Sequence, residues 1–142
     1  MLKRMKEIGA TANDMLEVYI LQIRCLTEIG CPAFNGTLTK DDINTLERIQ
    51  KTACRIILGP KYISYQNALK ILKIAQLDTR REKICLKFAL KLQKNDKFSN
   101  WLINAPRKTR SDKKFILPKT RTKIYQKSPL FHLAGILNKK KN

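Results

Sequence analysis

Residues 79–94 read TRREKICLKFALKLQK, which is the most regular helical pattern in the chain. Its apolar side chains recur at spacings of three and four residues, and this places them on one face of a helix. Thr79 and Glu82 have the spacing of a capping box, in which each side chain bonds the backbone N–H of the other residue. The pattern predicts an amphipathic helix that begins at Thr79, with apolar positions Ile84, Cys85, Phe88, Ala89 and Leu92.

Two longer helices are predicted upstream of this one. The first has a cap at Thr11 or Asn13 and runs to about Ile29, where Gly30 favours a C-terminal stop. The second has its cap at Thr39, because the two acids that follow favour the positive end of the helix dipole.

That second helix is expected to stop at Gly59, since Pro60 cannot continue it, and a shorter helix follows from Ser64. No stretch alternates with a period of two for long enough to predict a sheet. The sequence therefore predicts an all-α fold, a small helical bundle.

The formal net charge is +19, from 30 Lys and Arg against 11 Asp and Glu, and it is unevenly distributed. Residues 105–142 hold 12 of the basic residues and one acid, whereas residues 1–104 hold 18 and ten. Three prolines in the basic segment oppose long helices. We therefore expect a folded body over 1–104 and a mostly extended basic arm over 105–142. The apolar residues of the arm that are expected to dock on the body are Leu130, Phe131, Ile136 and Leu137.

Basic side chains form a stripe on the helix predicted over 79–94. They step by three and four residues, so they share one face, opposite the apolar one. Five like charges on one face repel each other, and a polyanion would relieve that repulsion and release counterions. The alternative is a solvated helix face without a partner. The stripe consists of Arg80, Lys83, Lys87, Lys91 and Lys94, and a smaller one upstream consists of Arg48, Lys51 and Arg55.

The basic arm supplies the remaining candidates for contact with a nucleic acid. Aromatic residues lie between its basic ones, so a base could stack while neighbouring phosphates are neutralised. The aromatic residues are Phe115, Tyr125 and Phe131, and the basic candidates are Arg107, Lys108, Arg110, Lys113 and Lys114. Together with the two stripes, they predict binding to a nucleic-acid backbone.

The sequence offers little for catalysis or for metal binding. His132 is the single histidine and lies far along the chain from other polar candidates, and helix capping explains Asp41 and Asp42. The four cysteines form no Cys-x-x-Cys pair and lie among apolar residues, so we expect buried, reduced thiols. These cysteines are Cys25, Cys31, Cys54 and Cys85. We expect a protein that is not an enzyme and has neither a metal site nor a cofactor.

No apolar run approaches the roughly 18 residues that a membrane span requires, and the N-terminus lacks the apolar region of a secretory leader. The scattered thiols favour a reducing compartment. We therefore expect an intracellular protein, in the nucleus or cytoplasm. A role at an anionic membrane surface stays open, because lipid headgroups attract the same charges.

Several sequence blocks, taken in order, resemble a known family. Residues 46–59 (LERIQKTACRIILG) and 80–89 (RREKICLKFA) are similar to blocks near the C-terminus of reverse transcriptases from non-LTR retrotransposons of the jockey kind. Residues 62–72 and 128–138 resemble two further blocks of that family. The resemblance spans nearly the whole chain, because it continues upstream at 18–24 and 31–34.

This resemblance implies the helical thumb of the polymerase and the segment after it. In that family the thumb grips the template–primer duplex, and the catalytic aspartates with their Mg²⁺ ions belong to a region upstream. We therefore expect a non-catalytic fragment that binds RNA, an RNA–DNA hybrid or DNA. Recognition would use phosphates and duplex shape rather than base edges.

Two other interpretations stay open. The chain could be a helical interaction module that docks on a polymerase core or another protein through an apolar face. It could also be a relic open reading frame without a selected function, for which marginal stability is expected. The apolar face available for docking consists of Leu16, Tyr19, Ile20 and Ile23.

Overall fold

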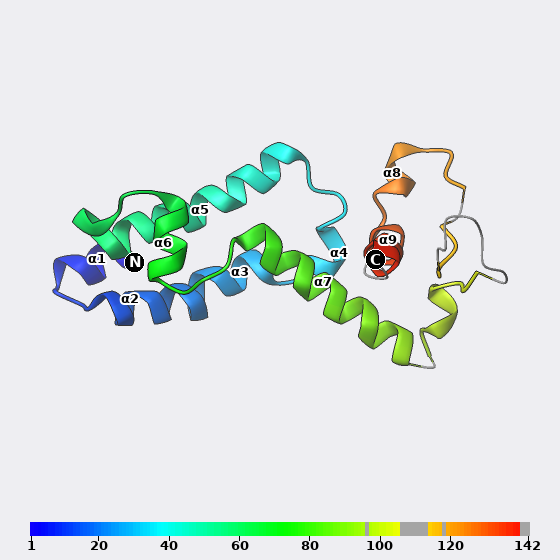
Figure 1. Ribbon diagram of the computed structural model, residues 1–142, viewed down its shortest axis with the longest axis horizontal. Helices are drawn as coiled ribbons and strands as arrows, with labels where there is room; N and C mark the ends of the chain where they lie inside the picture. Colours follow the sequence, from blue (N-terminus) through cyan, green and yellow to red (C-terminus); the bar gives the residue numbers. More distant parts are fainter. Residues whose placement is uncertain (96, 106–113, 118, 140–142) are drawn as a thin grey trace. The chain divides into compact units, whose positions relative to one another are not determined.

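The computed structural model describes residues 1–95, 97–105, 114–117 and 119–139, and over these residues the protein is all-α, as the sequence predicts (Figure 1). The chain forms two compact units, and it passes between them after Ile29, after Leu38 and inside one long helix, α7. Unit 1 comprises Met1–Ile29 and Thr39–Arg80. Unit 2 comprises Gly30–Leu38 and the described residues of Arg81–Asn142.

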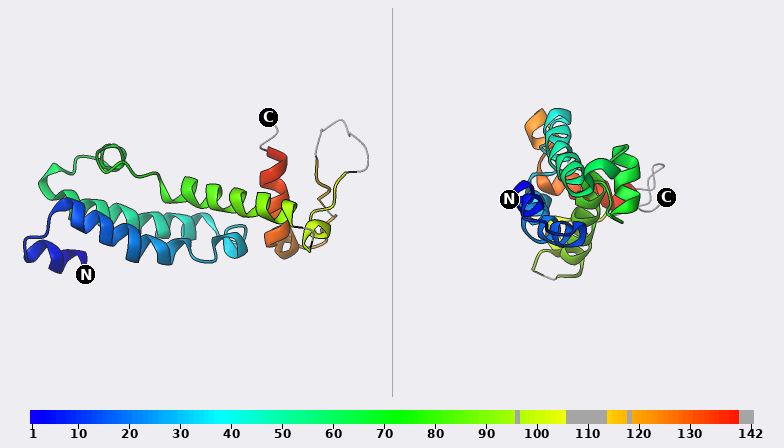
Figure 2. Two further views of the ribbon diagram at one scale, coloured as in Figure 1. Left: turned by 90° about the horizontal axis from the view of Figure 1, so that it is seen from below. Right: turned by 90° about the vertical axis from the view of Figure 1, so that its left-hand side faces the viewer.

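Unit 1 is built on α5, which runs antiparallel to a second helical segment made of α2, a π-helical stretch and α3 (Figures 1 and 2). Helices α1 and α6 pack on α5. The bounds are α1 Leu2–Glu7, α2 Ala12–Val18, π-helix Tyr19–Arg24, α3 Cys25–Glu28, α5 Lys40–Leu58, a 3₁₀ turn Gly59–Lys61 and α6 Tyr65–Ile71.

The first predicted helix is confirmed, with one irregularity. Thr11 Oγ1 accepts a hydrogen bond from the Asp14 backbone N–H at 3.3 Å, and the Asp14 carboxylate accepts one from the Thr11 N–H. The stretch from Tyr19 to Arg24 is π-helical, so the periodicity of the helix face changes within it. Gly30 follows the segment with φ +66°, a left-handed conformation that glycine adopts without steric cost.

Helix α5 begins and ends where the sequence predicts. Thr39 Oγ1 accepts from the Asp42 N–H at 3.2 Å, and the Asp42 carboxylate accepts from the Thr39 N–H at 2.9 Å. Gly59 ends the helix with φ +53°. The shorter helix predicted from Ser64 is also present, and Ser64 caps it, because Ser64 Oγ accepts from the Asn67 N–H at 3.2 Å.

The core of unit 1 surrounds a buried polar side chain, Gln50. The Tyr19 hydroxyl donates to Gln50 Oε1 at 2.7 Å, and Gln50 Nε2 donates to the Tyr65 hydroxyl and to the Ala75 carbonyl oxygen, each at 2.9 Å. Every polar atom of the Gln50 side chain therefore has a partner, which offsets the cost of burying it. The surrounding buried residues include Leu2, Met15, Ala53, Cys54, Ile57, Ala68 and Leu69.

Unit 2 is formed by short helices that pack with most of α7. Its elements are α4 Cys31–Phe34, α7 Leu77–Lys94 from Arg81 onward, a 3₁₀ turn Ser99–Trp101, α8 Lys123–Gln126 and α9 Pro129–Lys139. Helix α4 packs on α9. The buried residues of its core are Cys31, Cys85, Ala89, Leu92, Leu102, Phe115, Leu133, Ala134 and Leu137.

The predicted start of α7 at Thr79 is wrong, because the helix begins two residues earlier, at Leu77. A carboxylate from another helix supplies the cap in place of the Thr79 capping box. The backbone N–H groups of Leu77 and Asp78 donate to the two oxygens of Glu47, at 3.4 and 3.3 Å. Glu47 thus satisfies two of the amides that a helix start leaves without an intrahelical partner.

The described residues of 105–142 differ from the extended arm predicted for that segment. They include α9, whose Leu133, Ala134 and Leu137 are buried in the core of unit 2. Pro129, which was expected to oppose a helix, instead opens α9 at the first helical position, where its missing N–H costs nothing. The expected docking of apolar residues is confirmed at Leu137, and the folded part of the chain does not end at residue 104.

Candidate nucleic-acid interface

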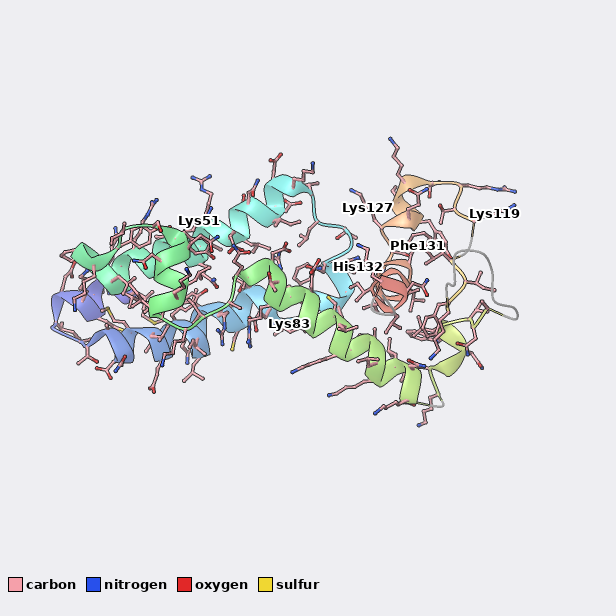
Figure 3. The ribbon with its side chains drawn as sticks, viewed as in Figure 1. Lys51, Lys83, Lys119, Lys127, Phe131 and His132 are labelled. Atoms are coloured by element: carbon pink, nitrogen blue, oxygen red, sulfur yellow. The ribbon has the colours of Figure 1, made fainter. Side chains whose placement is uncertain are left out.

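Four of the five lysine and arginine positions predicted on α7 lie on its exposed side. The side chains that face the core are at other positions of the helix, among them Cys85, Ala89 and Leu92. In the described part of the chain, none of the four lysines takes part in an ion pair. The exposed lysines are Lys83, Lys87, Lys91 and Lys94, and Lys83 is labelled in Figure 3.

The fifth residue, Arg80, already has a partner within the protein, so it is not free to contact a ligand as the spacing predicts. Its guanidinium forms a hydrogen-bonded ion pair with Glu28, which also pairs with Arg24 at 3.5 Å. The Glu28 side chain is 13% exposed, so this carboxylate holds Arg80 close to the surface of unit 1. The lysine stripe therefore begins at Lys83, and the sequence could not show this because Glu28 lies 52 residues away.

The three basic residues of the smaller stripe share one side of α5, as their spacing predicts. Lys51 Nζ lies 5.3 Å from the centre of the Tyr65 ring, and Arg55 Cζ lies 5.4 Å from the centre of the Tyr62 ring. Arg48 and Arg55 are exposed and Lys51 is half-buried. Because the rings attract these cations only weakly, Lys51 and Arg55 retain donors for a second partner.

Most candidates in the basic segment, namely Arg107, Lys108, Arg110 and Lys113, lie outside the described residues. Lys114 is described and exposed, with its Nζ 5.4 Å from the centre of the Phe115 ring. Further exposed lysines of unit 2 lie near α8 and α9, where Figure 3 labels Lys119 and Lys127.

The predicted stacking role of Phe115 is wrong, because its side chain is 2% exposed and belongs to the core of unit 2. Asn138 of α9 holds its backbone: the Phe115 N–H donates to Asn138 Oδ1 at 3.0 Å, and Asn138 Nδ2 donates to the Phe115 carbonyl oxygen at 3.1 Å. Tyr125, in contrast, is half exposed.

A second group of polar side chains, not recognised from the sequence, lies inside unit 2. The Sγ atoms of Cys31 and Cys85 are 3.4 Å apart, and both residues are fully buried. His132 projects from α9 toward α4, where its Nε2 lies 3.3 Å from Asn35 Nδ2 (Figure 3). Residues 31, 85 and 132 have no local pattern in common, so only the fold brings them together.

Interactions within this group lower the pKa of the Cys85 thiol below its usual value. The largest cause is the hydrogen bond with Cys31, and the nearby His132 and the positive charge of Arg81 act in the same direction against the opposing effect of burial. Cys54 in unit 1 behaves in the opposite way, because burial raises its pKa to about 11. The expectation of a buried thiol is wrong for Cys25, which is exposed.

Among the described residues, no group of three or more His, Cys, Asp or Glu side chains is placed to hold a metal ion, and this includes the group around Cys85. No helix of the described chain has the length and apolar character needed to cross a membrane.

Unit 2 also carries an apolar groove with a volume of about 710 Å³. Several large apolar side chains that line it are exposed, including Phe88, Trp101, Ile103 and Tyr125. The apolar face predicted for docking on the first helix is instead used internally. Tyr19 is buried in the core of unit 1, and Leu16, Ile20 and Ile23 pack partly buried against that core.

No protein-family model, no curated protein and no solved structure matches this chain. The features on which a function can be argued are therefore those of the described chain itself: an all-α fold of two units and an exposed row of lysines on α7.

Proposed function

We propose that the chain is a non-catalytic nucleic-acid-binding fragment that resembles the thumb region of a retroelement reverse transcriptase. It would grip the backbone of an RNA-containing duplex without reading base sequence. The observation that carries the proposal is the exposed row of lysines on α7, none of which is in an ion pair within the described residues.

Electrostatics supports a polyanionic partner. Lys83, Lys87 and Lys91 are successive neighbours on one helix face at spacings of four residues, where like charges destabilise a helix. Phosphates facing this row would attract the lysines, offset the repulsion between them and release counterions to solvent. A neutral ligand would offer neither gain.

The length of the row sets the number of contacts. Lys83 and Lys94 are eleven residues apart, which is about 16 Å along a helix. Four lysines over this distance can contact at most four phosphates, so α7 would contribute a slope of about −3 to −4 to the logarithmic salt dependence of binding. Lysines present a compact charge without the fork of arginine, which suits contacts that are indifferent to sequence.

Fluorescence anisotropy with an RNA–DNA hybrid, single-stranded RNA and duplex DNA, across a salt series, tests the proposal. The double variant Lys87→Glu/Lys91→Glu should weaken binding to every ligand by about tenfold or more and flatten the salt slope by about 2. The matched control is Lys61→Glu/Lys70→Glu, which makes the same change in net charge at exposed positions of unit 1.

The control should affect binding much less than the α7 variant does. An equal loss in both variants would show that only net charge matters, and the assignment to α7 would be wrong. Preference for the hybrid at a steep salt slope would support a thumb-like grip. Little binding of any nucleic acid at moderate salt would overturn the proposal.

The second candidate function is a helical protein-interaction module, and the apolar groove of unit 2 favours it. Exposed lysines adjoin residues that line the groove: Lys114 precedes Ile116 by two positions and Lys123 precedes Tyr125 by two. This charge selects an amphipathic helix with acidic residues beside its apolar face. Such a peptide should shift the emission of Trp101, which lines the groove, whereas a peptide with lysines at the acidic positions should not.

A further inference from the structure

We propose that Cys85 and Cys31 form a thiol-oxidation site, in which Cys85 reacts with hydrogen peroxide and Cys31 then closes a disulfide with it. The proposal is independent of nucleic-acid binding. Its first support is geometry: the two Sγ atoms are 3.4 Å apart and belong to segments 54 residues apart in sequence. A disulfide has an S–S bond of about 2.05 Å, so the sulfurs need to approach by little more than 1 Å.

The surroundings favour the thiolate of Cys85. The Cys31 thiol and the imidazole of His132 face it, and Arg81, which is fully buried, adds positive charge. The thiolate is the nucleophile in thiol oxidation, so stabilising it at neutral pH increases the reactive fraction.

Asn35 acts as a positioning residue for His132. Nε2 of His132 faces the Asn35 amide at 3.3 Å, and Asn35 Oδ1 is buried without a hydrogen-bond partner among the described residues. Because the two ends of an amide group have nearly the same shape, a flip would turn Oδ1 toward Nε2. In that orientation Asn35 Oδ1 would accept a hydrogen bond from Nε2–H of His132, which would fix the position of the ring beside Cys85.

The chemistry balances with peroxide as the oxidant. The Cys85 thiolate attacks one peroxide oxygen, the O–O bond breaks, and the departing hydroxide takes a proton to leave as water. Cys31 then attacks the sulfur of the resulting sulfenic acid, and the S–S bond forms as a second water leaves. Overall, two thiols and one peroxide give one disulfide and two waters.

Access to the site favours a small oxidant. Both thiols are fully buried, which excludes bulky reagents. The groove of unit 2 is lined by Pro32 of α4, Leu92 of α7 and Leu133 of α9, so it borders the three helices that carry Cys31, Cys85 and His132. A molecule as small as hydrogen peroxide could reach the sulfurs from there after a local opening.

The test uses the full chain with Cys25→Ser and Cys54→Ala, which leaves the pair as the remaining thiols. Peroxide near neutral pH should lower the intact mass by about 2 Da, corresponding to two hydrogens. Peptide mapping should then show Cys31 joined to Cys85. With Cys31→Ser added, Cys85 should stop at the sulfenic acid, which dimedone should then label once the chain is unfolded.

The pH profile separates activation from mere proximity. Between pH 7 and pH 6 the oxidation rate of the folded chain should change little, since the Cys85 pKa is about 5, whereas the guanidinium-unfolded chain should lose about tenfold per pH unit. Adding His132→Gln should restore part of that pH dependence. If the pair stays reduced, or oxidises no faster folded than unfolded, the proposal is wrong.

The unmodified chain provides the same test if the variants fail to fold. Exposed Cys25 and buried Cys54 then serve as internal comparisons. Mapping should find the Cys31–Cys85 link before Cys54 is modified, and modification of Cys54 first would contradict the proposal.

Discussion

Glu47 connects three parts of unit 1 through one carboxylate. The Tyr65 hydroxyl donates to it, and so do the Leu77 and Asp78 N–H groups at the start of α7. Glu47→Gln replaces one acceptor oxygen with a donor amide, so at least one of these donors loses its partner. We expect the free energy of unfolding to fall by about 1–3 kcal/mol, measured by urea denaturation with circular dichroism.

The control for this prediction is Glu17→Gln, which makes the same substitution at an exposed position of α2. It should change stability by no more than about 0.5 kcal/mol. Equal effects at the two positions would show that Glu47 does not cap α7.

Because Cys54 is buried, we expect the free energy of unfolding to fall in alkaline solution. Its pKa is raised by burial to about 11 in the folded chain, above the ordinary value of 9.0. The stabilising contribution is complete below about pH 9, and it is lost as the pH rises toward 11, because only the unfolded chain gives up this proton. The shift corresponds to about 2–3 kcal/mol over that window.

The measurement is urea unfolding at pH 8 and pH 10 in the presence of a reductant. Cys54→Ala should flatten the decline, whereas Cys25→Ala, at an exposed position, should leave it unchanged. Burial raises the pKa of Tyr19 and Tyr65 as well, so the Cys54→Ala curve should still fall at higher pH. A decline identical in all three chains would contradict the role given to Cys54.

The N-terminal caps of the helices show which contacts could be predicted from the sequence. The caps at Thr11 and Thr39 could be predicted because the group each one bonds lies three residues along the chain. The cap of α7 could not be identified in this way, since Glu47 is 30 residues from Leu77. The pairing of Arg80 with Glu28 could not be predicted either, because the two residues are distant in the sequence.

Helix α5 should depend measurably on its capping box. Thr39→Ala removes the oxygen that accepts from the Asp42 N–H, and we expect a loss of about 1 kcal/mol. The control is Thr52→Ala on the exposed side of the same helix, where alanine has the higher helix propensity and should add a few tenths of a kcal/mol. Chemical denaturation of both variants measures the difference, and a loss of the same sign in both would argue against the cap.

The lysine row on α7 was predictable because it depends only on the 3.6-residue period of the helix. Lys83 to Lys94 lie on the exposed side wherever the helix packs, since the opposite side carries Cys85 and Ala89. The cysteine pair was not predictable, because it needs α4 and α7 to be neighbours. Periodicity assigns a face to each helix but does not choose its partner.

The two-unit organisation could not be derived from charge. Net charge divides the sequence near residue 104, but the core of unit 2 combines Cys31 and Leu92 with Leu133 and Leu137. Apolar burial stabilises the fold, whereas surface charge contributes little to where a folded unit begins and ends. Prolines oppose a helix only in its interior, and Pro129 stands at the first position of α9.

Leucines on α9 test whether the C-terminal segment belongs to the folded protein. Leu133 is 2% exposed and Leu130 is 38% exposed, so the same substitution removes core packing at one position and much less at the other. We expect Leu133→Ala to cost about 2–5 kcal/mol and Leu130→Ala about 1 kcal/mol or less, measured by urea unfolding. If 105–142 were an extended arm, both variants would unfold like the unmodified chain. A large loss at Leu133 alone would instead require α9 to be part of the core, because a cavity costs free energy only where neighbours surround it.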